Sequence, residues 1–374
     1  MFVRTIPVAG LSSYSIGLGG RASLSAPVVA VFGASGFLGR YTCNELGQTG
    51  HAVNLPNRGC ELEFRHLKPM FDLGQAKFSF YSPRDRQSIV DAIRGADVVI
   101  NCVGKHYETK ALTNQKNFPY LKYVTNFGFT ETHVTVPRTI AEVAAELDVK
   151  QFIHVSSVAA SADSPSEWAR SKAAGEAAVK AAFGEDGVTV IRPNQMFGPE
   201  DRLLNWFAIA ARAFPFVPLP NDGESLSRPV YMGDVAKAIT KCVGNQSTFG
   251  KTLILEGKDD FTYKELSEFV YDITTQSPIV LPLPVNIAGL MGRVMGMQPN
   301  PAMTEDQAVL WGEDYLHEYG EEEEEVVEGF AELGLVPTPI EEKAFAYLHR
   351  YKAGGHFAMV DTYVGHVNTG GDKK

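Results

Sequence analysis

Trp168 and Lys172 stand four residues apart in the sequence W-A-R-S-K, which belongs to a long predicted helix. A lysine ammonium donates hydrogen bonds, and its charge can lower the pKa of a neighbouring acid. An indole N–H only donates, whereas general acid–base chemistry needs a group whose pKa approaches the working pH. We therefore expect this pair to bind a ligand without exchanging a proton, and we predict no catalytic residue. The simpler alternative for Lys172 is an exposed helix lysine.

Three glycines, Gly33, Gly36 and Gly39, follow an apolar strand and open a helix. The first permits a tight turn, the second lets the backbone approach a pyrophosphate, and the third allows close helix–strand packing. The helix start then offers free N–H groups to the anion. A glycine-rich turn without a ligand is the alternative. The predicted dinucleotide-binding residues here are Gly33, Ala34, Ser35, Gly36, Phe37, Leu38, Gly39 and Arg40.

Arg58 follows the second predicted strand, where proteins that bind NAD place an Asp or Glu on the ribose 2′-OH. The first acid after this strand is Glu61. A guanidinium at that place pairs well with a 2′-phosphate, and Arg40 could add a second cation. The sequence therefore favours NADP(H) over NAD. A solvent-facing loop arginine remains the alternative for Arg58.

Further candidate ligand contacts lie at the ends of other predicted strands, because open α/β sheets bind ligands at the carboxyl ends of their strands. We expect Ser82, with Pro83 beside it, to border an adenine ring. The other residues placed at strand ends are Cys102, Val103, Gly104, Ser156, Ser157 and Pro193.

Strands and helices alternate through the first half of the chain, which predicts an α/β fold: a Rossmann-like, doubly wound parallel sheet. After Gly198 the rhythm loosens into a smaller, mainly helical C-terminal region. There we expect residues 214–220 to form a proline-rich connector and residues 251–257 a strand that returns to the sheet. From about residue 281 the sequence predicts helices and loops, with an acidic run at Glu321–Glu325.

The chain divides by composition into four parts. Residues 1–27 contain Arg4, Arg21, five serines and no acid, which is typical of an organellar transit peptide; an unstructured terminus is the alternative. We predict a Rossmann domain at 28–258, a smaller partner-binding region at 259–353 and a tail at 354–374. The most apolar segment, 281–299, is interrupted by prolines and Arg293, so it is predicted not to span a membrane.

Bulk composition excludes several classes of protein. The net charge is −10, which argues against a nucleic-acid partner. The four cysteines lie far apart without paired spacing, so neither a disulfide framework nor a zinc site is expected.

These motifs together resemble the extended and atypical short-chain dehydrogenases/reductases. Members of that superfamily use a Ser or Thr, a Tyr and a Lys, and the lysine binds the nicotinamide ribose. Lys172 matches the family lysine, and Trp168 matches the tyrosine. The serine position falls near Ser156 and Ser157, or on Val158 by motif spacing.

A narrower resemblance covers residues 28–275, in six ordered blocks at 65–78, 97–110, 150–160, 170–176, 197–205 and 228–239. These blocks look like the nucleotide-binding accessory subunits of mitochondrial respiratory complex I, the NADH:ubiquinone oxidoreductase. The resemblance implies tightly held, structural NADPH and no catalysis. It also implies a place on the matrix side of the inner membrane, where the matrix arm meets the membrane arm. Other complex I subunits, and lipid at the C-terminal region, would be the partners.

Two other classes stay open. The first is an active NADP-dependent reductase or epimerase of an organelle, with another group supplying the proton. The second is an RNA-binding or redox-sensing relative of the same fold, which the acidic charge and isolated cysteines disfavour.

Overall fold

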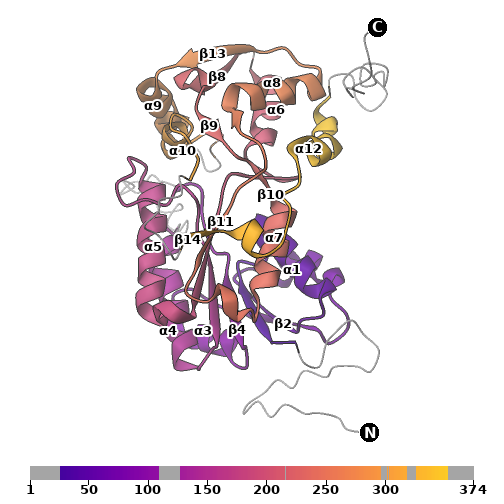
Figure 1. Ribbon diagram of the computed structural model, residues 1–374, viewed down its shortest axis with the longest axis vertical. Coiled ribbons are helices and arrows are strands. Elements are labelled where there is room, and N and C mark those ends of the chain that lie inside the picture. Colours follow the sequence, from indigo (N-terminus) through magenta and orange to yellow (C-terminus); the bar gives the residue numbers. More distant parts are fainter. Residues whose placement is uncertain are drawn as a thin grey trace, which may run out of the picture.

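The computed structural model (Figure 1) describes residues 26–108, 127–214, 216–295, 301, 303–317 and 326–352. Three predicted features lie outside these residues. They are nearly all of the transit-like segment, the acidic run Glu321–Glu325 and the tail 354–374.

An eight-stranded parallel sheet forms the centre of the molecule, in the order β14-β11-β6-β5-β4-β1-β2-β3. The order reverses after β1, which is the doubly wound arrangement predicted from the sequence. Its strands are β1 (Val29–Phe32), β2 (Val53–Asn57), β3 (Ala76–Phe80), β4 (Val98–Asn101), β5 (Gln151–Val155), β6 (Val188–Pro193), β11 (Thr252–Leu255) and β14 (Val326–Glu328).

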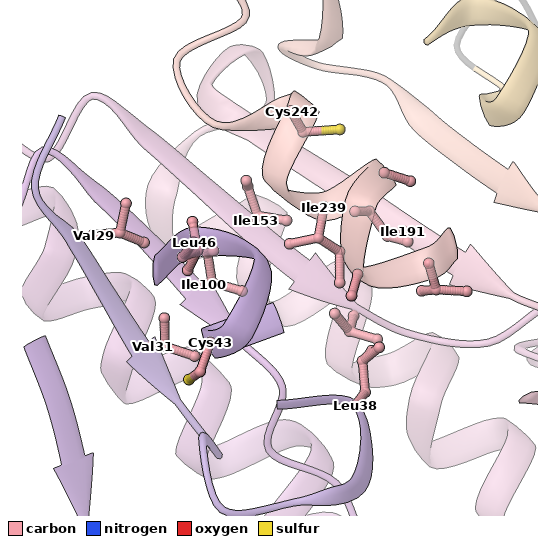
Figure 2. Packing of buried hydrophobic residues seen from close by; sticks show 14 of the residues in the cluster. Val29, Val31, Leu38, Cys43, Leu46, Ile100, Ile153, Ile191, Ile239 and Cys242 are labelled. Atoms are coloured by element: carbon pink, nitrogen blue, oxygen red, sulfur yellow. The ribbon is translucent and has the colours of Figure 1, made fainter. Parts of the chain in front are cut away.

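Helices cover both faces of this sheet (Figure 1). Side chains alternate between the faces of a strand, so Val29 and Val31 of β1 pack on one side while Ala30 and Phe32 pack on the other. Figure 2 shows the first side, where the aliphatic residues of the strands meet α1 and α7. The helices are α1 (Phe37–Gln48) and α7 (Met232–Cys242) on that side, and α3 (Arg86–Ile93), α4 (Val136–Glu146) and α5 (Glu167–Phe183) on the other.

Two local features concern the starts of α3 and α4. Helix α3 begins at Arg86 and is capped by the Asp85 carboxylate, so Ser82 and Pro83 stay in the preceding turn. Helix α4 is preceded by a π-helical turn, Thr130–Thr135. Such turns are uncommon and often occur at functional sites.

The C-terminal part of the chain builds a second core around Phe207, Tyr263 and Trp311. Its main elements are α6 (Leu204–Ala213), β8 (Phe216–Pro220), α8 (Tyr263–Thr274), β13 (Ile279–Leu283), α9 (Val285–Met295), α10 (Glu305–Leu310) and α12 (Ile340–Leu348). Helix α11 (Gly329–Glu332) packs on the main sheet instead, through Phe330. Figure 1 places most of these elements beyond the carboxyl ends of the sheet strands.

Two expectations for this part are wrong. The stretch predicted as a proline-rich connector contains β8, which pairs in parallel with β13. Prolines are tolerated there because each strand of a two-stranded ribbon has a free edge. Beyond residue 281, where only helices and loops were predicted, β14 joins the main sheet beside β11. The strand predicted at 251–257 does return to the sheet, as β11.

Within the described ranges, none of the helices combines the length and the apolar character that crossing a bilayer requires.

Candidate functional site

The glycine-rich turn between β1 and α1 has the geometry that its sequence predicts. Gly33 has φ +82°, and a Cβ there would lie 2.8 Å from the carbonyl carbon of Cys102. A Cβ on Gly39 would lie 2.2 Å from the Gly33 oxygen, so α1 can approach β1 only without a side chain at that position. Gly36 is the N-cap of α1 and has more room, because a Cβ there would lie 3.2 Å from its nearest neighbour.

The start of α1 is open to a ligand. No side chain caps its first turn, so the backbone N–H groups after Gly36 have no such partner. An uncapped helix start attracts anions because free N–H groups and the positive end of the helix dipole coincide there.

A cavity of about 360 Å³ lies between this helix start and the C-terminal core. It brings together ten of the predicted site residues: Gly36, Phe37, Leu38, Gly39, Cys102, Gly104, Ser156, Ser157, Lys172 and Pro193. They come from the β1–α1 turn, from the ends of β4, β5 and β6, and from α5. The carboxyl ends of the strands therefore converge as expected.

Lys172 lies buried at the centre of this arrangement. Its Nζ donates to the Val155 carbonyl at 3.4 Å, and it lies close to the backbone of Gly104. Burial lowers the pKa of Lys172 to about 8, and the neighbouring Glu176 carboxylate opposes that shift. The alternative of an exposed helix lysine is therefore wrong.

Trp168 lines the same cavity, but its indole N–H is already hydrogen-bonded to the protein backbone. Nε1 donates to the Lys105 carbonyl at 2.8 Å, and the Lys105 N–H donates to His133 Nε2 at 3.0 Å. His133 Nδ1 lies 2.8 Å from Ser171 Oγ, which in turn donates to the Trp168 carbonyl at 2.7 Å. These four hydrogen bonds form a closed ring through Trp168, Lys105, His133 and Ser171.

The directions of the bonds in this ring fix the state of His133. Its Nε2 accepts, so its Nδ1 carries the proton and donates to Ser171. Burial lowers the pKa of His133 to about 2, and the charge of Lys172 adds to the effect. The ring joins the π-helical turn to α5. The two can approach closely because residue 175 is a glycine, since a Cβ there would lie only 2.2 Å from the His133 oxygen.

The two serines after β5 differ in their partners. Ser157 Oγ lies 2.5 Å from the phenol of Tyr315, a buried residue of the C-terminal part. Ser156 Oγ is buried and has no hydrogen-bond partner in the described part of the chain. A buried hydroxyl without a partner carries an energetic cost that a bound ligand can relieve.

A second cavity, of about 200 Å³, adjoins the first at Gly104 and Lys105. It is lined by the predicted residues Arg58 and Val103, together with Pro83. The Arg58 guanidinium lies 5.4 Å from the centre of the Phe127 ring, and among the described residues it forms no ion pair.

Five predicted site residues line neither cavity: Gly33, Ala34, Ser35, Arg40 and Ser82. Of these, Gly33 contributes through its backbone, which approaches the backbone of Cys102. Arg40 is paired with Glu200 at 3.5 Å, which places it away from Arg58's cavity. Ser82 exchanges hydrogen bonds with Ser88, while its neighbour Pro83 reaches the cavity.

Several lining residues were not predicted from the sequence. They come from the segment after β4, from the π-helical turn and from the distant C-terminal part: Lys105, Thr132, Asp306, Gln307, Trp311 and Tyr315. Lys105 could have been predicted from the sequence, because it directly follows the predicted site residues Val103 and Gly104. No local motif marks the others.

The fold and the glycine turn are those of the dinucleotide-binding proteins of the epimerase type. Residues 29–253 match the NAD dependent epimerase/dehydratase family, and the chain belongs to that family. Solved structures share the fold: a dTDP-glucose 4,6-dehydratase from Bacillus anthracis, in complex with NAD, superposes with a TM-score of 0.60 at 14% identity, covering 87% of this chain and 96% of that one. The dTDP-glucose 4,6-dehydratase of Streptomyces venezuelae gives a TM-score of 0.61 at 18% identity, with 87% and 96% coverage.

Within that family the chain belongs with a particular group of mitochondrial proteins. It is 37% identical to the mouse protein named NADH dehydrogenase [ubiquinone] 1 alpha subcomplex subunit 9, mitochondrial, over 90% of this chain and 83% of the mouse protein. The Arabidopsis thaliana protein of the same name is also 37% identical, over 91% and 81%. The Neurospora crassa NADH-ubiquinone oxidoreductase 40 kDa subunit is 33% identical, over 91% and 84%. The resemblance noted from the sequence is confirmed.

Proposed function

We propose that this protein is an accessory subunit of mitochondrial respiratory complex I that holds NADPH as a structural cofactor and catalyses no reaction. The observation that carries the proposal is Trp168. Its indole stands where a titratable phenol would be needed, and its N–H is already used by the Lys105 carbonyl. The names of the relatives supply the complex, the mitochondrial location and the expectation of partner subunits.

The residues present fit a dinucleotide. Gly36 lines the larger cavity at the uncapped start of α1, where a pyrophosphate would bind. The buried hydroxyl of Ser156 and the ammonium of Lys172 can donate to the nicotinamide ribose. Arg58 supplies a cation for a ribose 2′-phosphate, which supports NADPH rather than NADH.

We further propose that the protein lies on the matrix side of the inner membrane, at the junction of the two arms of the complex. Its C-terminal part supports a partner or lipid contact there. Helix α9 exposes an apolar stripe of Ile287, Leu290 and Val294, which are 53%, 62% and 59% exposed. Contiguous exposed apolar surface of this kind commonly marks an interaction site.

A cofactor that binds only the folded state stabilises it by about 4 kcal/mol at a thousandfold excess over its Kd. Loss of the cofactor would therefore appear as an assembly defect. We expect Arg58→Glu to lower the Tm, the co-purified nucleotide and the incorporation into complex I. Arg65→Glu makes the same charge change at an exposed position lining neither cavity, and is the control. An unchanged Tm and nucleotide content in Arg58→Glu would overturn the proposal.

A second candidate is an NADPH-dependent carbonyl reductase, and one observation favours it. Tyr315 brings a phenol into the larger cavity, bonded to Ser157. Bound NADPH would supply the hydride for that reaction. The Tyr315 phenol would donate its proton to the carbonyl oxygen and regain one from water. Burial raises the pKa of Tyr315 to about 12, so the phenol stays protonated at neutral pH. Oxidation of NADPH by a panel of carbonyl compounds, lost in Tyr315→Phe, would establish this candidate over the first.

A further inference from the structure

Two cations and one unsatisfied hydroxyl line the smaller cavity. Arg58, which is exposed, borders it from the end of β2, and the half-buried Lys105 borders it from the segment after β4. Thr132 lines it from the π-helical turn, and its Oγ1 is buried with no partner among the described residues. Two positive side chains and an orphaned hydroxyl facing one cavity match an anionic, hydrogen-bonding ligand.

The electrostatics of Lys105 point the same way. Burial lowers its pKa, and the neighbouring charge of Arg58 lowers it further, while Glu108 opposes the shift. The Lys105 Nζ donates to a neutral acceptor, the Phe127 carbonyl, at 3.3 Å. Arg84, the other cation stacked on Phe127, is held by a bidentate pair with Glu131 at 2.7 and 3.0 Å. The effect of Arg58 on the pKa of Lys105 means that the two cations repel each other, and an anion bound between them would relieve that repulsion.

We propose that Lys105 is a second specificity-determining cation for the phosphate on the adenosine ribose, and that the indole of Trp168 positions it. This inference rests on the proposed NADPH-binding function and deepens it. A guanidinium and an ammonium from different strand ends would contact the same phosphate. The Thr132 hydroxyl adds a polar contact for the adenosine.

The positioning role follows from the ring of hydrogen bonds. Lys105 is held at both of its backbone groups, by the Trp168 indole at its carbonyl and by His133 at its N–H. The residue at the position of the family tyrosine would thus support cofactor binding in place of proton transfer.

The first test measures binding of NADPH and NADH to the full-length protein stripped of nucleotide. We expect Lys105→Ala to weaken NADPH about tenfold, the effect of one charge-assisted hydrogen bond, and to leave NADH nearly unchanged. Lys105→Arg keeps the cation and should retain most of the preference. Lys264→Ala, which removes an exposed lysine of α8, is the matched control and should change neither affinity.

The second test separates positioning from general support. Trp168→Phe should lower the NADPH/NADH affinity ratio several-fold, whereas a merely structural role would weaken both nucleotides alike. In a Lys105→Ala background, Trp168→Phe should have no further effect on the ratio, because the two act as one unit. If Trp168→Phe does not fold, Ser171→Ala breaks the same ring one bond away and serves in its place.

The outcomes distinguish the two proposals. Failure to bind either nucleotide would overturn the proposed function itself. Tight NADPH binding with an unchanged preference in Lys105→Ala would overturn only the role of Lys105. If Lys105→Ala lowers the preference for NADPH but Trp168→Phe does not, Lys105 stays in the site and the positioning role of the indole is overturned.

Discussion

The phenol of Tyr315 and the hydroxyl of Ser157 lie 2.5 Å apart, although 158 residues separate them in the chain. Asn194 holds the same segment by donating to the Tyr315 carbonyl at 2.7 Å. Nearby, Asp306 accepts hydrogen bonds from the Ser166 hydroxyl and the Trp168 backbone at the start of α5. The C-terminal part therefore closes the larger cavity and is bonded to three of the elements that build it: the ends of β5 and β6 and the start of α5.

Removal of the Tyr315 hydroxyl tests how much this contact between the C-terminal part and the main sheet contributes to the stability of the fold. We expect Tyr315→Phe to lower the free energy of unfolding by about 1 kcal/mol, because a buried hydrogen bond is lost while Ser157 keeps its bond with the Ala159 N–H. Urea unfolding of the full-length protein measures it. Tyr41→Phe removes an exposed bond to Glu200 and should cost less. Equal costs in the two variants would contradict a structural role for the buried contact.

The pKa of Lys172 predicts a pH-dependent affinity for NADPH. Its value in the free protein is about 8, below the usual lysine range, because the ammonium is buried. Charged Lys172 binds the ligand best, so the affinity should be constant from pH 7 to about 8 and fall above that value, by at most tenfold per unit. Titration calorimetry between pH 7 and 9.5 measures this dependence. Lys172→Met should bind more weakly and lose the fall; if the variant keeps it, another group titrates.

The same lowered pKa affects the stability of the nucleotide-free protein, with the opposite sign. Between about pH 8 and the unfolded lysine value near 10.4, the unfolded state binds more protons than the folded state. Lys172 therefore contributes an increase in stability as the pH rises through this window. We expect wild-type protein to gain stability relative to Lys172→Met across this window. A constant difference in unfolding free energy between the two proteins would contradict a lowered pKa for Lys172.

Gly36 and Gly39 should respond differently to alanine. At Gly39 the added Cβ would lie 2.2 Å from a backbone oxygen, so α1 must move and the protein should lose about 1–3 kcal/mol as well as its nucleotide. At Gly36 the nearest atom is 3.2 Å away and the backbone is extended, so stability should change little. Gly36→Ala should still weaken nucleotide binding, because Gly36 lines the larger cavity at the uncapped start of α1. Thermal unfolding and nucleotide content together measure both effects.

His133 should remain neutral across the whole physiological range. Its pKa is about 2 because it is buried, and its partners require the proton on Nδ1. Nitrogen-15 NMR of histidine-labelled protein should show the Nδ1–H tautomer with no titration from pH 8 down to pH 5. A midpoint near the ordinary value of about 6.5 would show that the ring through Trp168 is not formed.

The sequence determined the fold and the glycine-rich part of the candidate site. Alternating apolar strands and amphipathic helices are local patterns, and a doubly wound sheet follows from them by general rules of connection. The glycines at 33, 36 and 39 were likewise readable, because each acts through the backbone of its own turn. Lys172 was found by its spacing from Trp168 on one helix. The replacement of a phenol by an indole was visible without any structure.

Only the tertiary structure decided what closes the site and what the indole does. The cavities are also lined by residues from distant parts of the chain, namely Tyr315, Asp306 and Thr132. No short-range sequence pattern predicts contacts between residues so far apart in the chain. The pairing of β14 with β11 was also hidden, because a three-residue edge strand carries too little periodicity to be recognised. The role of Trp168 depended on the direction of its N–H, which is set by the packing of α5 against the segment after β4. Local chemistry fixed the residue types, and long-range packing fixed their partners.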